Sequence, residues 1–179
     1  LVGIVSRGDL LRVLYGDMVK YTGIGDALLF EGANQKNVKS LMQERLPREI
    51  MALFGKIGEL ADGAGVSVYV VGGFVRDLLL RIENFDIDIV VEGDGIAFSK
   101  LLGKSLGGRV RSHEKFGTSV IVLDNNFKID VATARMEFYK HPVALPTVEM
   151  SSIKSDLFRR DFTFNSLAVK LNGKDSFLL

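Results

Sequence analysis

The fold is decided by residues 66–91, which read VSVYVVGGFVRDLLLRIENFDIDIVV. The apolar run 66–71 predicts a strand, because it is short, rich in valine and bounded by glycine. The Gly72-Gly73 pair then predicts a tight turn, and apolar residues at three- and four-residue spacing predict a helix directly after it. Residues 86–91, in which two aspartates alternate with isoleucines before a pair of valines, predict another strand. The stretch therefore predicts a strand, a glycine turn, a helix and a strand in succession.

The second of these strands carries two acidic side chains, Asp86 and Asp88. Successive side chains on a strand point to opposite faces, so these two carboxylates share one face. Neighbouring carboxylates repel each other unless a cation lies between them. Mg²⁺ takes oxygen ligands of this kind, so the spacing predicts a divalent metal site.

The glycine turn supplies a matching anion site. Glycine lets the backbone approach a ligand closely, and the helix that follows presents free N–H groups and the positive end of its dipole. Arg76 falls in the first turn of that helix, where its planar guanidinium can bind an anion. A phosphate site close in sequence to a carboxylate pair predicts metal-dependent chemistry on a nucleotide.

Each of these features also has a structural interpretation. A Gly-Gly pair before a helix is more often a tight turn than a ligand site. Two aspartates on one strand are harder to explain in this way, because Asp is depleted in strands. The two features together favour a functional site over a purely structural one.

Three later motifs extend the pattern. They are HEKFGT at 113–118, IDVATAR at 129–135 and RRDFTFNSLA at 159–168. Together with GGFVRD at 72–77 and DID at 86–88, and in this order, they resemble the head domain of the class II tRNA nucleotidyltransferases and bacterial poly(A) polymerases, within the polymerase-β superfamily. The resemblance covers about residues 66–171 and departs from the family at Phe164 and Ser166, where isoleucine and alanine are usual.

The resemblance implies an enzyme that adds nucleotides to the 3′ end of tRNA from nucleoside triphosphates and releases pyrophosphate. It leaves open whether CCA, CC or a single A is added, from ATP, CTP or both, and a poly(A) polymerase is the alternative within the family. The alternatives outside it are a nucleotidyltransferase acting on a small molecule or a protein, and an adenylate-sensing binding module. The RRDFT motif argues against the first of these, and the intact aspartates and Arg76 argue against the second.

The resemblance also assigns site residues. Asp86 and Asp88 would hold two Mg²⁺ ions, and Asp130 would be the third carboxylate, as a general base or a further metal ligand. The residues expected to bind the nucleotide are Gly72, Gly73, Arg76, Asp77 and Arg160. The residues that could contact phosphate or RNA are Lys115, Thr118, Arg135, Tyr139 and Lys140. Arg159 is expected to be a surface or ion-paired neighbour, and Asp161 to cap a helix or to orient Arg160.

Composition excludes several other kinds of protein. Of the 179 residues, 47% are hydrophobic and 25% are charged, which is typical of a globular domain. There is no cysteine, so a disulfide framework and a thiolate zinc site are both excluded. No apolar run approaches the length of a membrane span, and no secretory signal is recognisable at the N-terminus, so we expect a cytoplasmic location.

Net charge does not indicate a nucleic-acid partner, because it is only +1. One basic cluster is more suggestive, and it could either contact phosphates or simply be solvated. Its members are Lys100, Lys104, Arg109, Arg111 and Lys115. His113 lies among them and is better interpreted as a hydrogen-bonding loop residue than as a catalytic base.

The sequence predicts three parts and an α/β fold class with an α+β layout. Residues 1–35 contain a strand–helix unit with Ser6 and Asp9 that resembles the last portion of a CBS domain, followed by a linker. Helical spacing predicts linker helices over 36–65. By the resemblance, 66–179 are expected to form the nucleotidyltransferase head. That head stops before the neck domain, so we interpret the chain as a fragment. The head is expected to be a small mixed, largely antiparallel sheet backed by helices on one face. Its oligomeric state is not predicted.

Overall fold

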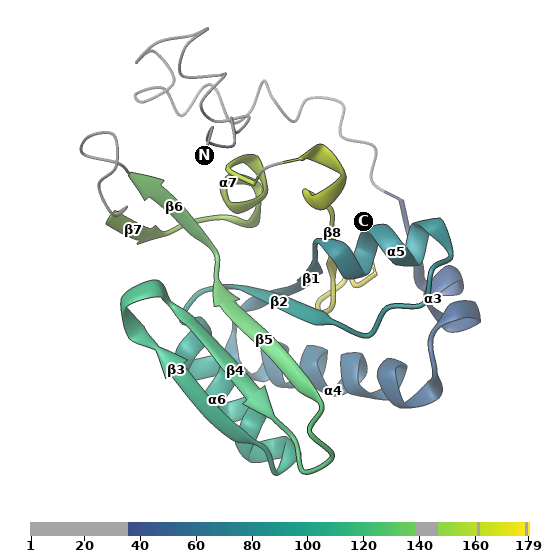
Figure 1. Cartoon of the computed structure of the whole chain (residues 1–179), viewed down its shortest axis with the longest axis horizontal. Coiled ribbons are helices and arrows are strands. Elements are labelled where there is room, and N and C mark those ends of the chain that lie inside the picture. The colour runs from purple at the N-terminus through teal and green to yellow at the C-terminus, as the bar shows by residue number, and fades with distance from the viewer. Residues whose placement is uncertain (1–35, 139–146, 161, 178) are drawn as a thin grey trace, which may run out of the picture.

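The computed structural model describes residues 36–138, 147–160, 162–177 and 179 (Figure 1). The described elements are α3 (Lys39–Arg45), α4 (Arg48–Ala64), β1 (Ser67–Val71), α5 (Gly73–Leu80), β2 (Ile87–Glu92), α6 (Gly95–Leu106), β3 (Arg109–His113), η2 (Glu114–Phe116), β4 (Thr118–Val122), β5 (Lys128–Thr133), β6 (Arg135–Phe138), β7 (Thr147–Met150), α7 (Ile153–Phe158), η3 (Thr163–Asn165) and β8 (Ala168–Lys170), where η marks a 3-10 turn. The predicted CBS remnant lies outside the described residues. None of the described helices is both long and apolar enough to span a bilayer.

Six strands form the main sheet, in the order β3-β4-β5-β2-β1-β8. Strands β2 and β5 pair in parallel, whereas the other four neighbouring pairs are antiparallel. Strands β6 and β7 form a separate antiparallel hairpin. The prediction of a mixed, largely antiparallel sheet is therefore confirmed.

The turn between β1 and α5 depends on Gly72. Its backbone has φ 70° and ψ −130°, a region that residues with a β-carbon rarely adopt. The strand β2 begins at Ile87, one residue later than predicted. The physical reason lies at Asp86, because its N–H donates to the Asn84 side chain at 2.8 Å. This bond makes Asp86 the last residue of the α5–β2 loop.

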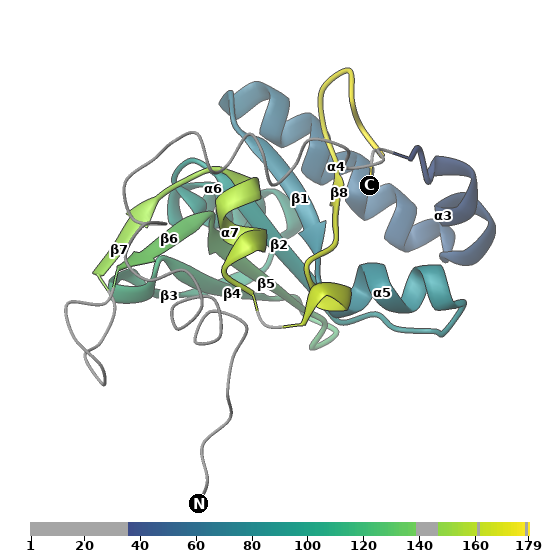
Figure 2. The same ribbon diagram turned by 90° about the horizontal axis from the view of Figure 1, so that it is seen from above.

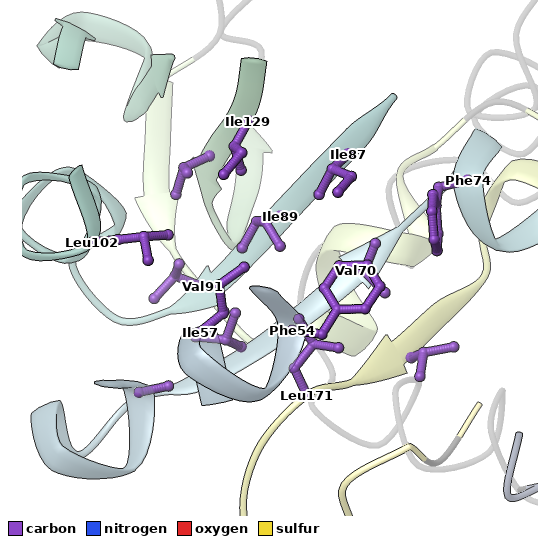
Figure 3. Close-up of a cluster of buried hydrophobic side chains, with 14 of the residues drawn as sticks. Phe54, Ile57, Val70, Phe74, Ile87, Ile89, Val91, Leu102, Ile129 and Leu171 are labelled. Carbon is purple, nitrogen blue, oxygen red and sulfur yellow. The ribbon is translucent and has the colours of Figure 1, made fainter. Parts of the chain in front are cut away.

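Helices α4 and α6 cover one face of the sheet and enclose the core (Figure 3). The apolar stripe predicted for α4 supplies Phe54 and Ile57, which lie fully buried among the strands. Phe54 meets the ring of Phe74 edge to face, with 5.5 Å between the ring centroids. Helix α4 follows Pro47 and ends at Gly65, which adopts the left-handed conformation that is common at the ends of helices.

The described residues cover only part of the opposite face of the sheet. Helix α7 packs Ile153 against Val71, Val90 and Ala134 on this face. In Figure 1, α4 and α6 lie toward the bottom and α7 with the β6–β7 hairpin toward the top, and Figure 2 shows α7 in front of the sheet. The expectation of helices on one face is thus incomplete, because α7 covers one end of the other face.

Candidate active site

Two of the predicted carboxylates lie side by side on the open face of the sheet. Asp88 on β2 and Asp130 on β5 are directly paired in the parallel register. Their neighbours Ile87, Ile89 and Ile129 are fully buried on the helix-covered face, so the alternation places both carboxylates on the other side. Asp86 precedes β2 and is exposed at the edge of this site.

The environment of these carboxylates disfavours their charged forms. Burial, followed by the charges of Asp86 and Asp130, raises the pKa of Asp88 to about 6, and the Arg160 charge opposes this rise. Burial and the charge of Asp86 also raise the pKa of Asp130, against the effect of Lys128. Three acidic groups therefore repel one another here, and a bound cation would relieve that repulsion.

The residues fit an open Mg²⁺ site better than a closed one. Within the described ranges, no group of three or more His, Cys, Asp or Glu side chains is arranged to hold a metal ion. Mg²⁺ is usually bound by one or two carboxylates together with substrate phosphates, so it does not require such a cage. The half-buried Asp88, flanked by the exposed Asp86, supplies carboxylate oxygens of the right kind.

The raised pKa of Asp88 predicts how stability depends on pH. Because the folded-state pKa of about 6 exceeds the ordinary value of 3.8, the native state binds more protons than the unfolded state between these values. The contribution of Asp88 to the free energy of unfolding is therefore fully present below pH 3.8 and is lost as the pH rises through about 6. Urea unfolding in EDTA should show this as a gap between wild type and Asp88→Asn that widens from pH 4 to pH 7. A gap of constant size would contradict it.

A pocket of about 360 Å³ opens between the carboxylates and Arg160. Asp88, Asp130 and Arg160 all line it, together with Thr118 and apolar residues of β1, β2 and β5. A second pocket, of about 400 Å³, lies beside α5, and its lining contains none of the predicted site residues. Two of the three predicted catalytic side chains, Asp88 and Asp130, thus line the pocket of about 360 Å³, and Asp86 does not.

The glycine turn adjoins this pocket through Arg160. A β-carbon added at Gly72 would lie 3.6 Å from Nη1 of Arg160 and 3.9 Å from the carbonyl oxygen of Asn165. The N–H of Gly72 itself donates to the Leu167 carbonyl oxygen at 2.9 Å. It is therefore unavailable to a phosphate, and an anion would have to use N–H groups that follow it at the start of α5.

Arg76 and Asp77 form a fixed pair on α5. The Asp77 carboxylate accepts from Nε and Nη2 of Arg76 at 2.7 and 2.9 Å and from the Asn84 side chain at 2.7 Å. Nη1 of Arg76 donates to the side-chain oxygen of Asn165 at 3.0 Å. The hydrogen bond from Arg76 lowers the pKa of Asp77, which is only 7% exposed. In this arrangement Asp77 orients Arg76, and Asn165 joins them in one hydrogen-bonded network.

Both arginines of the RRD motif converge on one carboxylate. The buried Asp156 accepts from Nε and Nη2 of Arg160 at 3.0 and 2.8 Å and from Nη2 of Arg159 at 2.6 Å. Helix α7 ends at Phe158, so the regular helical separation of neighbouring side chains does not apply to them. Of the two, Arg160 lines the carboxylate pocket, as expected of the arginine that faces the nucleotide, and Arg159 does not. The ion-paired role expected of Arg159 is confirmed.

Asp156 is the site residue that sequence reasoning missed. It precedes Arg159 and Arg160 by three and four positions, which is the spacing at which oppositely charged side chains meet on a helix. That spacing could have revealed it. Three other residues with predicted roles, Tyr139, Lys140 and Asp161, lie outside the described residues.

Comparison with known proteins now decides the family. The family model described as the poly(A) polymerase head domain matches residues 68–177. The chain belongs to this family. The match spans the glycine turn, the carboxylate strands and the RRD motif of the poly(A) polymerase head, which confirms the resemblance found in the sequence.

Similar proteins carry tRNA nucleotidyltransferase names. The chain is 49% identical over 176 residues to the A-adding tRNA nucleotidyltransferase of Geobacter sulfurreducens, covering 97% of this chain and 20% of that protein. It is 41% identical to the A-adding enzyme of Halalkalibacterium halodurans, covering 79% of this chain and 33% of that protein. It thus spans a fifth to a third of the length of these relatives.

Solved structures give the same fold. A CCA-adding enzyme in its apo form II is 48% identical, with a TM-score of 0.75, over 80% of this chain and 34% of that one. The Thermotoga maritima CCA-adding enzyme complexed with tRNA is 44% identical, with a TM-score of 0.69, over 80% of this chain and 32% of that one. A CCA-adding enzyme has also been solved in complexes with CTP and with ATP.

Proposed function

We propose that this chain carries the catalytic head of an enzyme that adds nucleotides to the 3′ end of tRNA from ATP, CTP or both. The observation that carries the proposal is the direct pairing of Asp88 with Asp130 beside Arg160 in one pocket. Family membership supports it, as do the complexes of similar enzymes with tRNA, CTP and ATP. A cytoplasmic location and an N-terminal CBS remnant stay predictions.

The reaction is a displacement at phosphorus. The 3′-oxygen of the RNA forms a bond to the α-phosphorus of the nucleoside triphosphate, the bond from that phosphorus to the bridging oxygen breaks, and pyrophosphate leaves. When bound, Mg²⁺ supplies positive charge that activates the attacking oxygen and neutralises the leaving group.

Each side chain of the site has a role in this scheme. Asp86 and Asp88 would hold the metal, and Asp130 would accept the proton of the attacking hydroxyl, for which a raised pKa suits it. Arg160 offers Nη1 to the triphosphate, because its Nε and Nη2 are held by Asp156. Catalysis by such a site is mainly positioning and charge neutralisation.

The test supplies labelled ATP or CTP with Mg²⁺ to the longest natural form of the protein that contains this chain. Three tRNA substrates are compared, ending before CCA, after the first C, and after CC. Growth by A alone on the CC end would indicate A addition, growth by two C residues would indicate CC addition, and full repair would indicate CCA addition. A long A tail would indicate a poly(A) polymerase instead. If no nucleotide is incorporated into any of the three substrates, the proposed function is wrong.

A further inference from the structure

The open face of the sheet continues beyond the carboxylates onto a cationic edge. The strand registers join Asp88 to Asp130, Asp130 to Val120, and Val120 to Arg111 in one row across four strands. Directly paired residues on adjacent strands point to the same face. Arg111 on the edge strand β3 therefore points to the same side of the sheet as the two carboxylates.

A second row runs parallel to the first. It joins Lys128 on β5 to Val122 on β4 and Arg109 on β3. Lys128, Arg109 and Arg111 are all exposed. Strands lie about 4.8 Å apart, so the Arg111 backbone is about 10 Å from that of Asp130, which is roughly one to two nucleotides of an RNA strand. Figure 1 shows β3 at the edge of the sheet beyond β4 and β5.

The opposite face of β3 is committed to the core, which fixes the direction of the arginines. Val110 lies between them in sequence and packs against Gly103 of α6, where it meets Ile121. Because side chains alternate along a strand, Arg109 and Arg111 must point away from α6. Neither has an ion-pair partner among the residues that the structure describes.

The proposed triphosphate site lies on the opposite side of Asp88 from these basic side chains. Gly72, Arg76 and Arg160, which are proposed to hold the triphosphate, belong to the β1, α5 and α7 side of Asp88. In a displacement at phosphorus the attacking and leaving oxygens lie roughly in line, on opposite sides of the phosphorus. A triphosphate held there would leave the side formed by β5, β4 and β3 for the RNA strand that carries the attacking hydroxyl.

We propose that Arg109, Arg111 and Lys128 form a track that binds the phosphates of the RNA strand just upstream of its reacting 3′ end. This inference rests on the proposed function and adds to it the surface on which the acceptor lies. Arg109 and Arg111 lie on an edge strand, where charged residues also discourage aggregation. Protection of an edge does not explain Lys128, because β5 is an interior strand. The structure also divides the basic cluster of the sequence, since Lys100 and Lys104 lie on α6 against the other face.

That division provides a matched control. The double variant Arg109→Gln/Arg111→Gln and the double variant Lys100→Gln/Lys104→Gln each remove two exposed positive charges. Lys128 is left unchanged because its charge affects the pKa of Asp130. Affinity for a tRNA ending in CC is measured without nucleoside triphosphate over a range of salt concentrations, and the melting temperature of each variant confirms folding.

The arginine variant should bind the tRNA on the order of tenfold more weakly, and the slope of log affinity against log salt should fall by about 1.4 for two lost contacts to a single strand. The lysine variant should stay within about twofold of wild type, and Arg109→Lys/Arg111→Lys should keep most of the affinity. The KM for the nucleoside triphosphate should be unchanged. If both glutamine variants lose the same affinity for tRNA, or if the arginine variant loses none, the proposed track is wrong. The proposed function still holds in that case, provided that the wild-type protein incorporates nucleotides. Absence of incorporation by wild type would instead contradict the proposed function.

Discussion

Asp88→Asn is expected to lower nucleotide incorporation by on the order of 10³-fold while the fold survives. The change keeps the volume of the side chain but removes the charge that would hold Mg²⁺ beside Asp86 and Asp130. Metal coordination in such reactions contributes several kcal/mol to the transition state, and each 1.36 kcal/mol corresponds to about tenfold in rate. Incorporation of labelled nucleotide at saturating tRNA, with the 3′ end before and after the reaction resolved on a gel, measures the effect.

The same substitution should raise the stability of the protein without metal. Asp88 is partly buried and is repelled by two other acidic groups, so its charge opposes folding at neutral pH. The melting temperature in EDTA at pH 7 should therefore increase for Asp88→Asn. Asp124→Asn is the matched control, because Asp124 is exposed in the turn that connects β4 to β5 and should change neither activity nor stability. Near wild-type activity in Asp88→Asn would remove the metal role assigned to this carboxylate.

The position of Asp88 and Asp130 could be predicted because each lies on a short strand with buried neighbours. Alternation alone fixes which face such a side chain takes, and both Ile129 and Val131 are buried as this requires. Their pairing could not be predicted in the same way, because β2 and β5 are separated by α6, β3 and β4. The two carboxylates meet because β2 and β5 are neighbours in the sheet. That strand order could be expected only by analogy with the family.

The interactions of the arginines were harder to predict than their presence. The sequence placed Arg76, Arg159 and Arg160 in the right motifs but did not identify the carboxylates that hold their guanidinium groups. Each direction is set by a buried carboxylate, Asp77 for the first and Asp156 for the other two. Asp77 was predicted to bind nucleotide, whereas the structure surrounds it with Arg76 and Asn84. Burial of an acidic side chain depends on tertiary packing, which local spacing does not report.

Asp156 is expected to act as a positioning residue for Arg160, so Asp156→Ala should lower both stability and affinity for the nucleotide. The carboxylate is 0% exposed and holds two guanidinium groups, which would lose a charged partner inside the protein. Breaking a buried ion pair in this way costs about 3–5 kcal/mol in the free energy of unfolding. For a protein of this size that is a decrease in melting temperature of about 10 °C. Thermal unfolding in EDTA measures it.

A purely structural role would lower stability alone, so a second measurement is needed. Asp156→Asn keeps the volume of the side chain, and its effect on the KM for the nucleoside triphosphate is compared with and without Arg160→Met in a double-mutant cycle. If Asp156 acts through Arg160, Asp156→Asn should raise this KM in the wild-type background and add little once Arg160 is absent. Additive effects would show that Asp156 serves the nucleotide site by another route, because the two hydrogen bonds to Arg160 would then carry none of the effect.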